Sequence, residues 1–231
     1  MARRCSPASL VLVMWPTLPN RTVYPGAEAP DVAHAAPVAP LPVVVPRTRP
    51  LRWLDFDLEN RPLSYWYDDR CTAEVTAIAW AVAEENPRVV VRFLSPGGGS
   101  RQMLEAFVRA YDAADGVTGH YIRKHDLPII NGALVEHGMA PLRPKLTCDT
   151  RLDLIRWKDL PASQEALGAM LGLSAPKEKM SQADWRDANR LTPSGIAGTC
   201  RRVVGDVEQH LELRAALLAR GLLKAPRMWR P

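Results

Sequence analysis

Hydrophobic and polar residues alternate from position 51 onward in patterns typical of strands. Residues 51–59, LRWLDFDLE, read as a buried strand that ends in carboxylates. Residues 72–83 alternate around β-branched side chains, and residues 88–94, RVVVRFL, strongly favour a strand. We therefore expect three strands in succession at the start of the folded region.

After these strands, short strands alternate with helices. A glycine-rich turn and a serine cap precede an amphipathic helix, and Gly138 is well suited to end the helix that follows the next short strand. The predicted helices span residues within 95–114 and at 126–138, 164–173, 181–190 and about 193–220, and the predicted strands span 116–120 and 145–150. This order indicates an α/β fold with a mixed sheet flanked by helices.

The first fifty residues differ from the rest of the chain. They are rich in Pro and Ala and have no sustained helical or alternating pattern. Proline removes backbone donors and disfavours helix before itself, so residues 1–50 are predicted to be extended or disordered and to pack little against a domain at 51–231. The basic and apolar start resembles a secretory signal only superficially, because Pro16 and Pro19 follow the apolar run quickly.

Composition narrows the class of protein. With 47% hydrophobic and 24% charged residues, the chain is typical of a soluble globular protein, and it has no apolar run near the ~20 residues of a membrane span. A net charge of +5 and a pI of about 9.2 suit a polyanionic partner. The four cysteines lie far apart without zinc-ligand spacing, so we expect neither a disulfide scaffold nor a zinc site, and a cytoplasmic location.

Two carboxylates at the end of the first strand are candidate metal ligands. Asp57 and Glu59 are two residues apart, so they project from the same face of a strand, and Asp55 shares that parity. Adjacent carboxylates repel unless a cation lies between them, and hard oxygen ligands suit Mg²⁺ or Mn²⁺. A solvated acidic turn is the alternative for these two residues alone.

A second acidic position follows the short strand at 116–120. Asp126 begins a predicted helix, with His120, Arg123 and Lys124 just upstream as candidate phosphate or nucleotide ligands. Helix capping by Asp126 and a structural role for His120 remain alternatives.

The third acidic position lies in the last helix. Asp206 borders the apolar stripe of this helix, where a carboxylate is costly unless it is paired or binds a metal ion. A local salt bridge is the alternative.

Together, the segments LDFDLENRP, GHYIRKHDLPII and VVGDVEQHLEL resemble, in this order, the three motifs of the DEDD-type 3′–5′ exonucleases. The resemblance covers about residues 51–222 and includes exonucleases of tailed phages. It implies a ribonuclease-H-like fold and two divalent ions held by the four acidic residues Asp57, Glu59, Asp126 and Asp206. It also implies hydrolysis of phosphodiester bonds in nucleic acid, for which we favour single-stranded or frayed DNA over RNA.

The chain departs from these motifs where the family carries a tyrosine four residues, or a histidine five residues, before the last aspartate. Arg202 and Arg201 stand there, and a guanidinium cannot act as a base near neutral pH. We expect Arg202 either to bind the scissile phosphate or to form a salt bridge. His210 is a conceivable substitute base, although it can equally point away. A catalytically weakened nucleic-acid-binding subunit and an exoribonuclease are the alternative functions.

Overall fold

The structure is a computed structural model that describes residues 49–62, 73–83, 85, 88–157, 159–174 and 179–231. The prediction of an extended segment at 1–50 falls almost wholly outside the described residues. Of that segment, Arg49 and Pro50 are described, and Arg49 Nη1 lies 2.8 Å from a carboxylate oxygen of Asp115. Residues Arg47–Pro231 form one compact unit.

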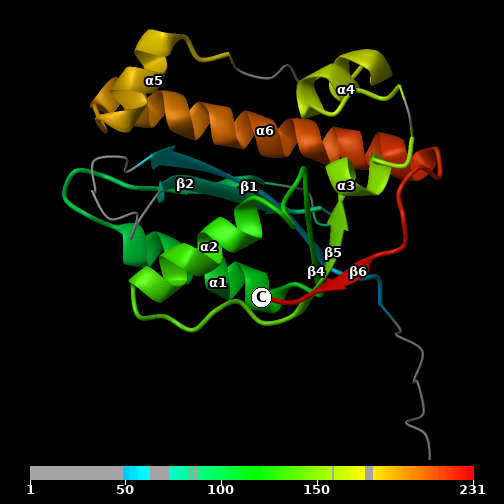
Figure 1. Ribbon diagram of the computed structural model, residues 1–231, viewed down its shortest axis with the longest axis horizontal. Coiled ribbons are helices and arrows are strands. Elements are labelled where there is room, and N and C mark those ends of the chain that lie inside the picture. The colour runs from blue at the N-terminus through cyan, green and yellow to red at the C-terminus, as the bar shows by residue number, and fades with distance from the viewer. Residues whose placement is uncertain (1–48, 63–72, 84, 86–87, 158, 175–178) are drawn as a thin grey trace, which may run out of the picture. The chain divides into compact units, whose positions relative to one another are not determined.

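A six-stranded mixed sheet forms the centre of this unit, with the strand order β3-β2-β1-β4-β5-β6 (Figure 1). β1 pairs antiparallel with β2 and parallel with β4, and β5 pairs parallel with β4. The strands are β1 Trp53–Pro62, β2 Ala73–Val82, β3 Val90–Phe93, β4 Gly116–Gly119, β5 Lys145–Asp149 and β6 Arg227–Trp229. The three consecutive strands predicted from the sequence are thus one antiparallel half of the sheet.

Helices cover both faces of the sheet. α1 and α2 lie on one face, and the long α6 crosses the other face with α4 and α5 beside it (Figure 1). The helices are α1 Ser100–Ala113, α2 Asp126–Glu136, α3 Thr150–Leu154, α4 Gln164–Leu171, α5 Gln182–Asn189 and α6 Pro193–Ala219. None of the described helices is long and apolar enough to cross a membrane.

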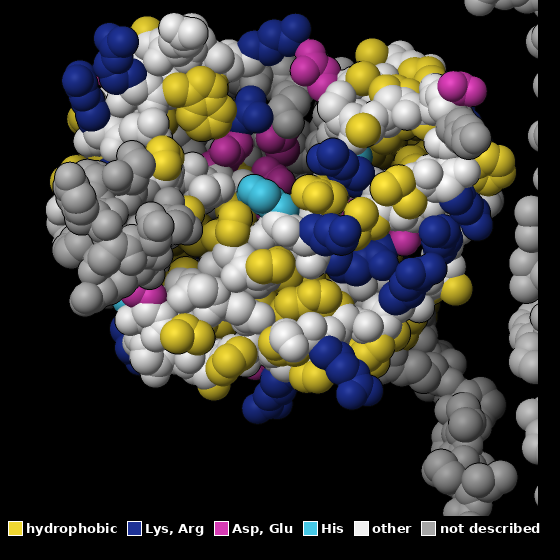
Figure 2. Space-filling model, viewed as in Figure 1, with side chains coloured by type: hydrophobic (Ala, Val, Ile, Leu, Met, Phe, Trp, Pro, Cys, Tyr) yellow, Lys and Arg dark blue, Asp and Glu magenta, His cyan; other side chains and the backbone are white. Residues whose placement is uncertain are grey.

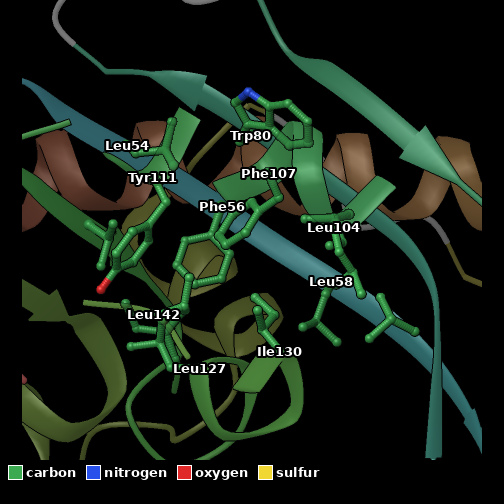
Figure 3. Close-up of a cluster of buried hydrophobic side chains, with 14 of the residues drawn as sticks. Leu54, Phe56, Leu58, Trp80, Leu104, Phe107, Tyr111, Leu127, Ile130 and Leu142 are labelled. Carbon is green, nitrogen blue, oxygen red and sulfur yellow. The ribbon is translucent and has the colours of Figure 1, made fainter. Parts of the chain in front are cut away.

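The alternation along β1 divides its side chains between these two layers. Leu54, Phe56 and Leu58 are buried in the main core, where Phe56 packs against Phe107 of α1 at a ring-centroid distance of 5.0 Å (Figure 3). The intervening residues Asp55, Asp57 and Glu59 have the opposite parity and face α6. The same strand therefore builds the core with one face and presents three carboxylates with the other.

Two details differ from the sequence prediction. The chain around Trp229 forms the edge strand β6. The sequence did not predict this strand, because it has only three residues and no clear alternation. The N-cap of α1 is Gly99 with a positive φ of 112° and no side-chain cap, so no serine caps this helix. The residues after Asp149 form the short α3, which Asp149 caps by accepting a hydrogen bond from the backbone N–H of Leu152.

Gly119, the last residue of β4, allows the closest approach between β4 and the segment after it. A Cβ atom there would lie 2.4 Å from Ile122 Cγ2 and 2.7 Å from the carbonyl oxygen of Phe56. Gly119→Ala is therefore expected to lower the free energy of unfolding by about 1–3 kcal/mol, as overpacking of a core does.

The control for this substitution is Gly132→Ala on α2, where nothing lies within 4 Å of the added atom. It should stabilise the helix by up to about 1 kcal/mol. Urea unfolding of both variants tests the difference, and equal stabilities would contradict the packing described at Gly119.

Candidate metal centre

Asp57, Glu59 and Asp206 bring carboxylate oxygens from two elements to within 4.8 Å of one another. Asp57 and Glu59 come from β1 and are partly buried, whereas Asp206 comes from α6 and is 4% exposed. Three like charges at this spacing repel unless cations lie among them. Carboxylate oxygens are the donors that Mg²⁺ and Mn²⁺ prefer, so this group suits a divalent ion.

Small residues on β2 bring α6 close to these carboxylates. In the register of the sheet, Ala81, Ala79 and Ala77 lie opposite the three acidic residues of β1, in that order. The alanines pack against Val203 and Val207 of α6 in one buried cluster. Because an alanine side chain ends at Cβ, the helix can approach the sheet closely enough for Asp206 to reach β1.

Arg202, one turn before Asp206 on α6, already contacts this group. Its Nε atom lies 2.5 Å from Oε1 of Glu59, and Nη2 lies 3.9 Å from Asp206. Burial lowers the pKa of Arg202, but the negative charges of Glu59 and Asp206 outweigh burial and raise it. The guanidinium also lies over the ring of Trp185 on α5, 5.1 Å from its centroid. A permanent positive charge thus stands at the edge of the three carboxylates.

Asp126, the fourth predicted ligand, does not belong to the group of oxygens within 4.8 Å that the described residues form. It is the first residue of α2 and is 3% exposed, with Oδ2 3.6 Å from Nδ1 of His125. The pKa of Asp126 lies above its usual value, because burial is the largest effect on it. The contact with His125 opposes this rise, and the negative charge of Asp149 adds to it.

His125 connects Asp126 electrostatically to the three carboxylates. Its contact with Asp126 raises its pKa, burial opposes this, and the charges of Asp126 and Glu59 raise it further. No spacing pattern in the sequence indicates that His125 lies close enough to Glu59 to be affected by its charge.

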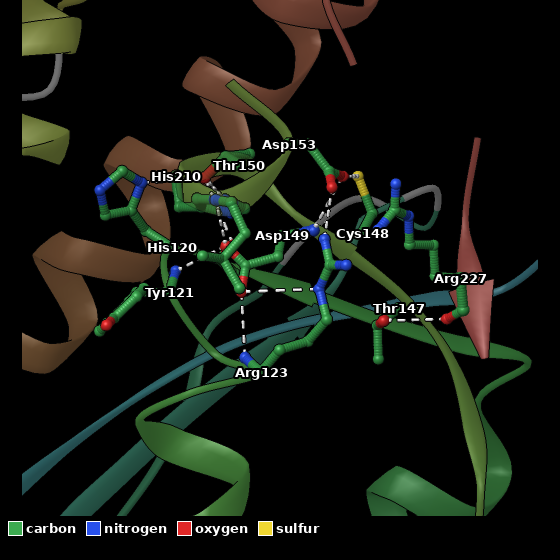
Figure 4. A network of polar contacts seen from close by, with 12 residues as sticks. His120, Tyr121, Arg123, Thr147, Cys148, Asp149, Thr150, Asp153, His210 and Arg227 are labelled. Atoms are coloured by element: carbon green, nitrogen blue, oxygen red, sulfur yellow. Dashed lines mark hydrogen bonds and ion pairs between the residues drawn. The ribbon is translucent and has the colours of Figure 1, made fainter. Parts of the chain in front are cut away.

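Asp149 and Asp153 hold the segment between β4 and α2 in place (Figure 4). Asp149 accepts hydrogen bonds from the backbone N–H groups of Tyr121 and Arg123, each at 3.0 Å. The Arg123 side chain forms an ion pair with Asp153 and lies 3.7 Å from Asp149. The guanidinium of Arg123 thus lies against two buried carboxylates, and the role of Arg123 in substrate binding stays a prediction.

His120 and His210 belong to a buried chain of hydrogen bonds around Thr150 (Figure 4). His120 Nε2 lies 2.9 Å from the carbonyl oxygen of Ala162, and its Nδ1 lies 3.0 Å from Thr150 Oγ1. On the other side of this hydroxyl, His210 Nε2 lies 3.0 Å away, and His210 Nδ1 lies 2.7 Å from Asp55. Both ring nitrogens of each histidine therefore face protein atoms.

Burial lowers the pKa of His120 to about 4, so at neutral pH its ring is neutral. Its Nε2 then donates to the carbonyl group, and its Nδ1 is an acceptor that faces the hydroxyl group of Thr150. The Thr150 hydroxyl group also lies 3.3 Å from the carbonyl oxygen of Gly119. The contact between His210 Nδ1 and Asp55 is fully inside the protein, because Asp55 is 0% exposed.

These contacts bear on the roles expected for His120 and His210, whereas Lys124 is unaffected by them. His120 has the structural role that remained open, and it does not present a ring nitrogen to a nucleotide. His210 is 2% exposed, so it is not a base for a water molecule in the cleft. Lys124 is exposed beside the start of α2 and stays a candidate phosphate ligand.

One face of the molecule gathers acidic side chains in a hollow, with a histidine at its edge and Lys and Arg side chains around it (Figure 2). Beside this hollow, basic side chains alternate with hydrophobic ones (Figure 2). A surface with this arrangement suits a ligand that carries both anionic groups and apolar rings.

The strand order and the helices on both faces confirm the predicted ribonuclease-H-like mixed sheet. The chain is similar in structure to a family B DNA polymerase from the hyperthermophilic archaeon Pyrobaculum calidifontis, with a TM-score of 0.60 and 17% sequence identity over 75% of this chain. It spans 25% of that polymerase's length, and at this identity the similarity is one of fold. No protein-family model and no curated protein matches the sequence.

The buried contact between Asp55 and His210 predicts a measurable effect on stability. His210→Leu leaves the buried Asp55 carboxyl group without this partner, and an unsatisfied buried polar group costs about 1–3 kcal/mol. Adding Asp55→Leu removes that group and should recover most of the loss. Urea unfolding at pH 7 of both single variants and the double variant measures this coupling. A His210→Leu chain as stable as the unmodified protein would contradict a stabilising contact between these two residues.

Proposed function

We propose that this chain is a divalent-metal-dependent 3′–5′ exonuclease that hydrolyses phosphodiester bonds at the ends of nucleic acid, with DNA as its favoured substrate. The observation that carries the proposal is the meeting of Asp57, Glu59 and Asp206 on the sheet face that α6 covers. These residues belong to the first and third of the three segments that resemble the DEDD exonucleases. That resemblance supplies the 3′–5′ polarity.

The fold supports a nucleic-acid-processing enzyme. The similarity to a family B DNA polymerase adds weight to DNA as the substrate, although fold alone does not decide the chemistry. The net charge of +5 agrees with a polyanionic ligand. The proposed reaction therefore depends on the residues of the site, and the fold is in agreement with it.

In this proposal, Asp57, Glu59 and Asp206 would hold one divalent ion. Asp57 and Asp126 would be ligands of a second divalent ion. When bound, such a pair polarises the scissile phosphate and lowers the pKa of water, so a separate base becomes dispensable. Within the protein, β1 and α6 fix the carboxylates before substrate arrives. The carboxylate of the buried Asp126 lies close to His125. When its ring is protonated, His125 offsets part of the negative charge of the site.

Arg202 has a second task in the proposed reaction. Its guanidinium offers forked N–H donors beside the carboxylates, a geometry that matches phosphate oxygens. In the structure these donors contact Glu59. We infer that Arg202 exchanges this contact for the scissile phosphate when substrate binds, and that it neutralises the charge that develops there.

The contact between Arg202 and Glu59 also favours one other function. Because Arg202 neutralises Glu59, a metal ion has to compete with a cation that belongs to the chain. A nucleic-acid-binding protein with weak or no hydrolysis would tolerate such a contact. Metal-dependent hydrolysis separates the two functions, since only the exonuclease needs the ion to bind.

The test uses single-stranded DNA and RNA oligonucleotides of matched sequence, labelled at the 5′ end. With Mg²⁺ or Mn²⁺, the labelled DNA should shorten one nucleotide at a time, and EDTA should stop the reaction. Metal ions supply several kcal/mol of charge stabilisation, so Asp57→Ala should lower the rate at least about 100-fold.

Glu85→Ala serves as the matched control, because Glu85 pairs with Arg52 on an exposed part of the chain and should leave the rate unchanged. Release of the label as a mononucleotide at the outset would reverse the polarity. Equal rates for the unmodified chain and Asp57→Ala would refute the proposed site.

A further inference from the structure

A cavity lies beside residues 120–125, the segment that leads to Asp126. It has a volume of about 280 Å³, and its walls include Leu160 and Leu167, with Trp157 and Arg151 among the residues at its rim. This volume is at the lower limit of the ~300–1,000 Å³ of pockets for drug-sized ligands, so it suits a single ring system. None of the described residues that line it is acidic.

Apolar side chains at this cavity are exposed to an unusual degree. Ile155 is 75% exposed, and Trp157 is 45% exposed. Two arginines accompany them: the guanidinium of Arg156 lies 5.2 Å from the centre of the Trp157 ring, and that of Arg151 lies 4.1 Å from the centre of the Tyr121 ring. Planar apolar groups therefore alternate with fixed positive charges along this part of the surface.

Contacts between neighbouring residues connect the cavity to the segment that leads to Asp126. Ala162, which lines the cavity, accepts the hydrogen bond from His120. Arg151, another lining residue, stacks on Tyr121 directly after His120 in the chain. The segment 120–125 thus has the cavity on one side and leads into Asp126 on the other.

A ligand that fits this surface needs a flat apolar ring and an anionic group close to it. A nucleotide within a single strand has both, since its base stacks on aromatic side chains while its phosphates contact arginines. In a duplex, the bases are already stacked and paired, so a cavity of this kind selects unpaired bases. A protein partner would be held by a wider apolar area than one cavity of this volume provides.

We propose that this cavity, formed around Trp157, holds a nucleobase of a single-stranded nucleic acid whose end lies at the metal centre. The proposal rests on the proposed function, which it deepens by assigning a binding site for one unpaired base of the substrate. Arg151 and Arg156 contact the phosphates on either side of that base. Short substrates that reach only the metal centre do not contact Trp157, whereas longer strands do.

The experiment measures binding of fluorescein-labelled oligothymidylates of increasing length by fluorescence anisotropy, in EDTA so that no strand is cleaved. Trp157→Ala should raise the Kd of long strands about tenfold, which lies within the range that stacking of one base supplies, and should leave dinucleotide binding unchanged. Trp157→Phe keeps an aromatic face and should restore most of the affinity.

Phe93→Ala is the matched control, because Phe93 is 48% exposed and lies on β3 at the opposite edge of the sheet. It should bind strands of every length as the unmodified chain does. An equal loss in Phe93→Ala and Trp157→Ala would overturn the proposal, because the effect would not belong to this cavity. Unchanged binding by Trp157→Ala at all lengths would overturn it as well.

Two further outcomes separate this proposal from its alternatives. If the unmodified chain forms dimers in sedimentation experiments that Trp157→Ala dissociates, with strand binding unchanged, then the cavity serves a second copy of the chain and the proposal fails. If strands bind through Trp157 in EDTA but no metal ion supports hydrolysis, the base site stands and the exonuclease proposal fails.

Discussion

Mutual repulsion among Asp57, Glu59 and Asp206 is the constraint around which this structure is arranged. Their oxygens lie within 4.8 Å of one another, so the fold must hold three negative charges together before any ligand arrives. Close packing of α6 on the alanines of β2 provides the geometry. The positive charge of Arg202 reduces the free-energy cost of this repulsion, because Arg202 contacts Glu59 directly.

The buried contact between Asp55 and His210 joins the same two elements, β1 and α6, at a second point. Asp55 lies two residues before Asp57 on β1, and His210 lies one turn after Asp206 on α6. Joining them at 2.7 Å sets how far α6 can slide along the strand, and therefore where Asp206 stands. Through Thr150 and His120, this pair also reaches the segment that carries Asp126 (Figure 4). The three acidic segments are thus positioned by one buried network.

Much of this arrangement could be predicted from local sequence. The alternation in LRWLDFDLE predicted both the buried face of β1 and the carboxylate face. Periodicity also predicted the long last helix, because α6 has a clear apolar stripe. These features depend on residues that are near one another in the chain.

Contacts between distant segments could not be predicted in this way. Asp55 and His210 are 155 residues apart, and neither residue has a neighbour that indicates the other. Arg123 looked like a phosphate ligand because it precedes Asp126, yet Asp149 and Asp153 attract it into the interior. Asp126 stands apart from the other three acidic residues because the turn after β4 places it at the start of α2. The spacing of residues along the chain does not show where their side chains point in the folded protein.

The most direct test of this account is the position of Mn²⁺ in crystals of the chain, found from its anomalous scattering. The account predicts an ion bound by Asp57, Glu59 and Asp206 at about 2 Å from their carboxylate oxygens, with Arg202 moved away from Glu59. Crystals in saturating Mn²⁺ with no ion at these carboxylates, and with Arg202 still on Glu59, would contradict it.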